Sequence, residues 1–106
     1  MDIADWRKKI DELDRRLVEL LSERARAAQE IGRLKRNTNL PIYEPDREQI
    51  VFSHVQELNR GPLPNRDVVR IFERIMDVMR NIQKEEIAPK AESAKAQTEM
   101  DSEVND

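Results

Sequence analysis

Cysteine is absent from this chain of 106 residues. Without thiols the protein has no disulfide, no thiolate metal site and no cysteine nucleophile, and its composition fits a reducing compartment. Glycine and aromatic residues are also scarce, with two glycines and an aromatic content of 4%. Because strands favour aromatic and β-branched residues and hairpin turns need glycine, we expect no sheet and an all-α fold.

A long apolar run and an excess of basic residues are missing as well. The apolar stretches fall far short of the ~20 residues that span a bilayer, and no signal segment is recognisable. The net charge is −3, and the stretch from Ala88 onward, with two lysines and five acidic residues, accounts for all of it. We therefore expect no nucleic-acid partner, no membrane partner and a cytoplasmic protein.

Apolar residues in steps of three and four predict three helices, one long, one short and one of medium length. We place them at about residues 3–36, 45–59 and 65–87. Residues 1–87 then form one helical domain. The acidic stretch 88–106 has few large apolar residues to bury, so we predict a disordered tail there.

The lengths of these helices do not suit a closed three-helix monomer. At 1.5 Å per residue the first helix is roughly 50 Å long and the second only ~22 Å, less than half of it. The rest of the long helix must pack against something else. Since the chain has no second long helix, the simplest partner is another copy of the chain, which predicts an intertwined homodimer in which the long helices pack together.

The apolar seam of the first helix is interrupted by one charged residue. Its ten positions are Ile3, Trp6, Ile10, Leu13, Leu17, Leu20, Arg24, Ala27, Ile31 and Leu34. Lys35 follows Arg24 by eleven residues, which leaves it about 20° out of register and ~16 Å away on the same face. The two cations can bind one small anion between them, or both can lie with their stems on the seam and their heads in water.

The other two helices also carry polar residues on their apolar stripes. The stripe of the second helix is Glu44, Glu48, Val51, Val55 and Leu58, and that of the third is Val69, Phe72, Met76, Met79 and Gln83. Each polar residue has an ordinary explanation, since the helix dipole favours acids in a first turn and Arg47 can form a surface ion pair. Their convergence from three helices favours a shared cavity.

The chemistry of this cavity is that of a binding site without a nucleophile. It offers guanidinium, ammonium, amide and carboxylate groups, but no serine, cysteine or histidine paired with a base. Its acids do not form a metal-ligand set, so we expect no metal and no cofactor. Such a site suits a small dianion with a hydroxyl group, held and polarised rather than attacked.

Three segments resemble the all-helical chorismate mutases in their order and spacing. They are "WRKKIDELDRRLVELLSERARAAQEIGRLKR", "PIYEPDREQ" and "VVRIFERIMDVMRNIQ". The resemblance implies an intertwined dimeric enzyme of aromatic amino-acid biosynthesis that converts chorismate to prephenate by a concerted Claisen rearrangement. That reaction needs neither a covalent intermediate nor a proton transfer.

The resemblance also implies roles for individual residues. Arg7 and Arg24 correspond to the arginines that bind the two substrate carboxylates. Lys35 and Gln83 correspond to the donors to the ether oxygen, and Glu48 to the acid that holds the ring hydroxyl.

Three further positions complete the implied substrate-binding set. Glu44 is a second acidic position, and Arg47 matches an arginine that supports the site. Met79 departs from the family, since relatives often have a small hydroxyl residue there.

Two alternative functions remain. An isochorismate-pyruvate lyase shares the fold, the arginines, the lysine and the glutamine, but its members lack the glutamate that follows Arg47 here. A non-catalytic mutase-like module that docks on another biosynthetic enzyme is the second alternative. Its seams should be free of ligand-binding groups.

Overall fold

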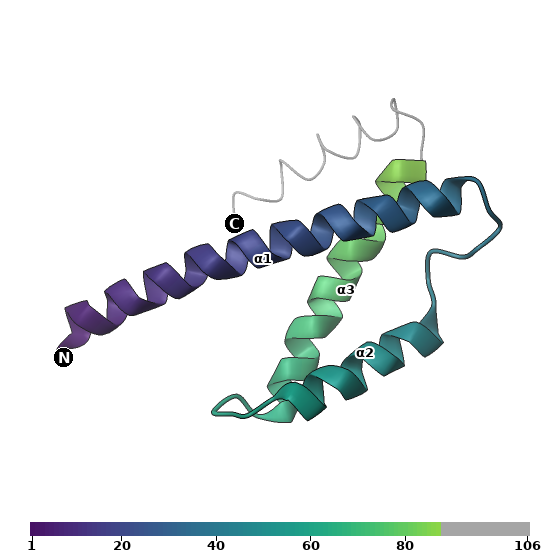
Figure 1. Ribbon diagram of the computed structural model, residues 1–106. Coiled ribbons are helices and arrows are strands. Elements are labelled where there is room, and N and C mark those ends of the chain that lie inside the picture. The colour runs from purple at the N-terminus through teal and green to yellow at the C-terminus, as the bar shows by residue number, and fades with distance from the viewer. Residues whose placement is uncertain (88–106) are drawn as a thin grey trace, which may run out of the picture.

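The computed structural model describes residues 1–87 and folds them into three α-helices, with no strand in that range (Figure 1). They are α1 (Ile3–Arg36), α2 (Pro45–Leu58) and α3 (Asn65–Ile87). The predicted all-α fold and its three helices are confirmed, with ends that differ by about one residue. The predicted tail at residues 88–106 lies outside the described residues.

Local signals explain where α1 begins and ends. The Asp5 backbone N–H donates to the Asp2 carboxylate at 2.9 Å, and the Asp2 N–H donates back to Asp5 at 3.1 Å. This reciprocal cap satisfies two backbone donors that a helix start leaves unpaired. At the other end the Asn37 N–H donates to the Leu34 carbonyl and the Thr38 N–H donates to the Lys35 carbonyl.

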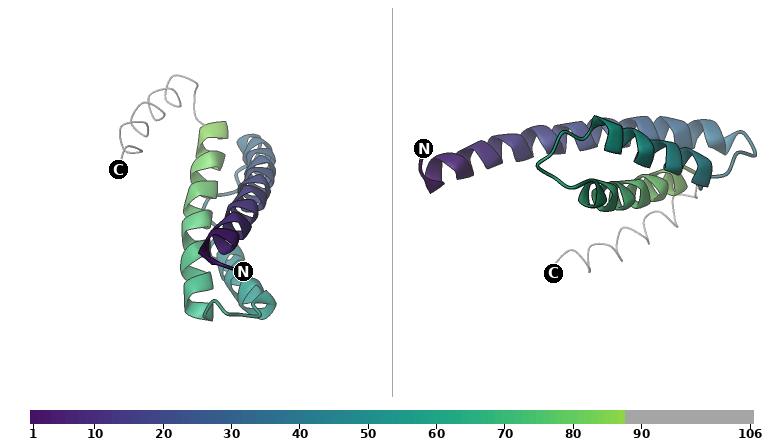
Figure 2. Two further views of the ribbon diagram at one scale, coloured as in Figure 1. Left: turned by 90° about the vertical axis from the view of Figure 1, so that its left-hand side faces the viewer. Right: turned by 90° about the horizontal axis from the view of Figure 1, so that it is seen from below.

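The helices form an open arrangement in which α3 crosses the C-terminal half of α1 and α2 packs against α3 (Figure 2). On α1 the face towards α3 is built from the small residues Ala28 and Gly32, both buried. The α2–α3 core consists of Val51, Val55 and Val68, extended by partly buried apolar residues of α3. This packing leaves room for a cavity where the three helices meet.

Two details of the predicted stripes are wrong. Leu58 is 61% exposed, because it is the last residue of α2 and no described element covers it. The apolar stripe of α3 begins at the buried Val68 rather than at Val69, which is only half-buried. Val68 lies one helical turn before Phe72, so it shares the face that meets α2.

The predicted seam of α1 is not buried within the chain. Its six large apolar residues in the N-terminal half are between 45% and 69% exposed: Ile3, Trp6, Ile10, Leu13, Leu17 and Leu20. That half of α1 extends beyond α2 and α3 (Figure 1). The described chain therefore presents a long apolar stripe without a cover. None of the three helices in residues 1–87 combines the length and the apolar character that a membrane-spanning helix requires.

Candidate active site

A cavity of about 420 Å³ lies where the three helices meet. Of the eight predicted site residues, these line it: Arg24, Lys35, Glu44, Arg47, Glu48, Met79 and Gln83. The helices bring together residues that are up to 59 positions apart, from Arg24 to Gln83. The predicted convergence of polar residues on one cavity agrees with this geometry.

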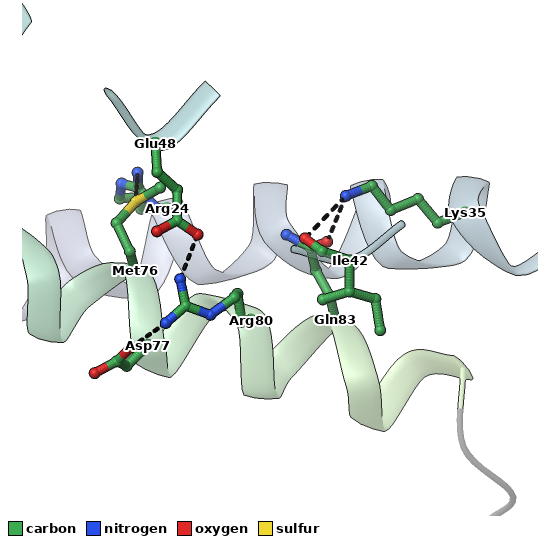
Figure 3. A network of polar contacts seen from close by, with 8 residues as sticks. All are labelled: Arg24, Lys35, Ile42, Glu48, Met76, Asp77, Arg80 and Gln83. Carbon is green, nitrogen blue, oxygen red and sulfur yellow. Dashed lines mark hydrogen bonds and ion pairs between the residues drawn. The ribbon is translucent and has the colours of Figure 1, made fainter. Parts of the chain in front are cut away.

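Lys35 lies at the end of the cavity formed by α1 and α3. The residue is only 8% exposed. Its ammonium donates to the Gln83 side-chain oxygen at 3.1 Å and to the Ile42 carbonyl at 3.4 Å (Figure 3). It also pairs with the Glu44 carboxylate at 3.2 Å. These partners compensate the burial of the charge. Because the amide oxygen of Gln83 faces the lysine, its NH₂ group remains available to a ligand.

Gln83 can reach the cavity because α1 and α3 lie very close at this point. A Cβ atom added to Gly32 would lie 3.0 Å from the Gln83 Cα and 3.1 Å from the Gln83 carbonyl oxygen. A side chain at this position would push the two backbones apart by a few tenths of an ångström, and glycine avoids that. Gly32 is therefore a positioning residue that the sequence analysis did not single out.

Two cations in the cavity have no carboxylate partner within residues 1–87. Within the three described helices and their loops, Arg24 donates only to the Met76 sulfur, at 3.4 Å, and Arg47 forms no ion pair. Burial lowers the pKa of the Arg24 guanidinium, and repulsion from Arg47 lowers it further. Sulfur is a weak acceptor, so an anion between the two guanidinium groups would relieve both effects.

Glu48 is held by a residue that the sequence analysis missed. Arg80 of α3 donates to the Glu48 and Asp77 carboxylates (Figure 3). Its guanidinium carbon lies 5.3 Å from the centre of the Tyr43 ring. The hydrogen bond to Glu48 raises the pKa of Arg80. The sequence spacing could have identified Arg80, because it lies four residues after Met76 and three before Gln83 and therefore shares their face of the helix.

The remaining predicted residues occupy different surroundings. Met79 is only 5% exposed and forms part of the apolar wall. Arg7 is exposed on α1 and does not line this cavity. At 1.5 Å per residue, the 28 residues between Arg7 and Lys35 correspond to roughly 42 Å of helix.

The lining defines the chemistry that the cavity can support. It contains no serine, threonine, cysteine or histidine among the described residues, and no group of three or more potential metal ligands occurs within residues 1–87. Cations, one amide and two acids can bind, orient and polarise an anion. Such preorganised groups stabilise charge that develops during a reaction.

A protein-family description of chorismate mutase type II matches residues 6–84. The chain belongs to this family. A solved chorismate mutase (form II) from Thermus thermophilus superposes with a TM-score of 0.76 and 35% identity, covering 77% of this chain and 93% of that one. The all-helical fold inferred from the sequence is therefore that of the chorismate mutase type II family.

Two of the curated relatives that this family member matches differ in how much of their length it covers. A bifunctional chorismate mutase/prephenate dehydratase from Pseudomonas aeruginosa is 48% identical over 75 residues, which cover 66% of this chain and 20% of the relative. A chorismate mutase from Methanocaldococcus jannaschii is 27% identical over 84 residues, covering 78% of this chain and 85% of the relative. The chain thus spans about a fifth of the length of the bifunctional relatives it matches.

Proposed function

We propose that the protein is a chorismate mutase, an isomerase that converts chorismate to prephenate. The observation that carries this proposal is the pair of unmatched cations, Arg24 and Arg47, in the same cavity as the Lys35–Gln83 pair. Chorismate is a dianion with a ring hydroxyl and an ether oxygen. The cavity offers groups for each of these features, and its described lining contains no nucleophile that would attack them.

Binding would fold the substrate into the compact conformation from which the rearrangement proceeds. Arg24 can grip a carboxylate with two parallel N–H donors, a geometry that lysine cannot supply. Fixing the two reacting ends of one molecule against each other converts part of the activation entropy into binding. The apolar wall that includes Met79 leaves few arrangements for the rest of the substrate.

Lys35 and Gln83 are assigned to the ether oxygen. Negative charge develops on this oxygen as the carbon–oxygen bond breaks, so a buried ammonium and an amide donor beside it favour the transition state over the substrate. Lys35 fixes the orientation of the Gln83 amide through their 3.1 Å hydrogen bond. Neither group needs to transfer a proton.

Glu48 is assigned to the ring hydroxyl. Arg80 binds one of its carboxylate oxygens, Oε2, and the other can accept a hydrogen bond from a ligand. Glu44 serves a different purpose, since its ion pair with Lys35 keeps that ammonium in place. The glutamate after Arg47 supports the mutase over the isochorismate-pyruvate lyase that shares this fold.

The active protein is proposed to be a homodimer whose sites are shared between subunits. The exposed apolar stripe of α1 is a surface of the kind that marks protein–protein interfaces. If Arg7 and Lys35 contact one substrate, the roughly 42 Å between them within a chain requires that Arg7 comes from the partner. The solution mass should then be twice the 12.5 kDa of the chain.

Purified protein mixed with chorismate tests the activity directly. The ultraviolet absorbance of chorismate should fall, and prephenate should accumulate in equal amount. A parallel reaction with isochorismate, assayed for released pyruvate, tests the lyase alternative. If neither chorismate nor isochorismate is consumed, the non-catalytic docking module is the remaining interpretation. Its natural partner is an enzyme that consumes prephenate, because the bifunctional relatives carry a prephenate dehydratase.

A further inference from the structure

Arg80 connects Glu48 of α2 with Asp77 of its own helix and lies over the Tyr43 ring. Its side chain is 24% exposed and that of Glu48 only 12%. The guanidinium is therefore fixed on three sides. In Figure 3 the Glu48 carboxylate and the Arg80 guanidinium point towards each other across the gap between the two helices.

The Glu48–Arg80 pair also forms a boundary of the site. Both residues line the main cavity and a second, more open hollow next to it, to which Tyr43 and Lys84 contribute. Glu48 thus has a cation on its outer side and the main cavity on its inner side. A carboxylate anchored through one oxygen from outside presents its other oxygen in a defined direction.

The charges of the cavity pair off in a simple way. Six charged residues between positions 1 and 87 line the cavity, and among them Glu44 pairs with Lys35 and Glu48 pairs with Arg80. Arg24 and Arg47 remain, which gives a surplus of two positive charges for a dianion. Without Arg80 the Glu48 carboxylate would cancel one of them and repel the substrate.

We infer that Arg80 is a positioning residue that holds Glu48 against the substrate hydroxyl and preserves the positive charge that the dianion needs. This inference rests on the proposed mutase function. Arg80 affects the kinetics indirectly, because it fixes the position of the Glu48 carboxylate and neutralises its charge. Arg80 itself need not touch the reacting atoms.

The test compares Arg80→Met, Arg80→Lys and a matched control, Arg70→Met, by steady-state kinetics with chorismate. Arg70 lies on the same helix and pairs with Asp67 at the same spacing as Arg80 with Asp77, but outside the cavity. We expect Arg80→Met to lower kcat/KM about 10-fold to 100-fold, with a clear rise in KM. Arg80→Lys should recover part of the loss, and Arg70→Met should leave the kinetics unchanged.

Combination with Glu48→Gln shows whether the effect passes through the carboxylate. In the Glu48→Gln background there is no charge for Arg80 to neutralise, so Arg80→Met should raise KM by less than about 2-fold. Circular dichroism and melting curves identify variants that fail to fold. If Arg80→Met is one of them, Arg80→Lys and Arg80→Gln take its place in both Glu48 backgrounds.

The outcomes separate the two proposals. Suppose that the wild-type protein turns chorismate over. The inference is overturned if folded Arg80→Met has unchanged kinetics, or if Arg80→Met has the same effect with Glu48 and with Gln at position 48. Either result leaves the mutase function intact. If wild type shows no turnover, calorimetric binding of chorismate replaces KM. The proposed function then fails, and weaker binding by Arg80→Met alone still supports the role of Arg80. Absence of both turnover and binding overturns both.

Discussion

Lys35 on α1 and Gln83 on α3 lie 48 residues apart in the chain and are joined by a 3.1 Å hydrogen bond from the ammonium to the amide oxygen. The bond fixes both donors at one end of the cavity. It also orients the amide, since an oxygen engaged by Lys35 leaves the NH₂ group for a ligand. Most of the mechanism proposed above depends on this pair.

Replacement of Lys35 by alanine should lower kcat about 10²-fold to 10³-fold, because the ammonium meets charge that exists mainly in the transition state. KM should change less. Helix content by circular dichroism and the dimer mass should be retained. Lys8→Ala, which removes an exposed lysine from the same helix, is the control and should retain full activity. A Lys35→Ala enzyme within a few-fold of wild type would remove this residue from the mechanism.

Gln83→Glu should make the activity depend on acid. At neutral pH the new carboxylate lies beside Lys35, which favours its charged form, and a carboxylate repels the developing oxyanion and cannot donate. Protonation at low pH restores a donor, so kcat should rise as the pH falls. Gln83→Ala, which has no group to protonate, should show no such rise. Equal activity of Gln83→Glu at acid and neutral pH would contradict the assignment.

Gly32→Ala tests the close contact between α1 and α3. Helix propensity alone would stabilise the protein by about 1 kcal/mol. The new methyl group, however, would lie 3.0 Å from the Gln83 Cα and 3.1 Å from its carbonyl oxygen, so the backbone of α3 would have to shift by a few tenths of an ångström. Overpacking of this kind costs about 1–3 kcal/mol, so urea unfolding should show a net loss of stability, together with a fall in kcat. A higher melting temperature with full activity would show that the helices separate freely.

Mixed dimers of Arg7→Ala and Lys35→Ala test the shared site. Each homodimer should be nearly inactive. A heterodimer combines the intact Arg7 of one chain with the intact Lys35 of the other at one of its two sites, so an equal mixture should regain roughly a quarter of wild-type activity. The chains should be mixed by unfolding and refolding, because an intertwined interface exchanges slowly. Refolded mixtures that contain heterodimers but stay inactive would refute the shared site.

Several features were predictable from the sequence because they depend on local rules. The three helices follow from apolar spacing, and Pro45 begins α2 where its missing N–H is harmless. Arg24 was recognisable as a charged residue on an apolar seam. The order and spacing of three motifs indicated the family, which the family match confirms.

The partners of these residues were decided only by the tertiary structure. Helical periodicity gives the face on which a side chain lies, but the residue opposite depends on how two helices cross and how closely they approach. For that reason the sequence placed Glu48 on a stripe and missed its ion pair with Arg80. It likewise showed Gly32 as a helical glycine and not as the contact that brings Gln83 to Lys35.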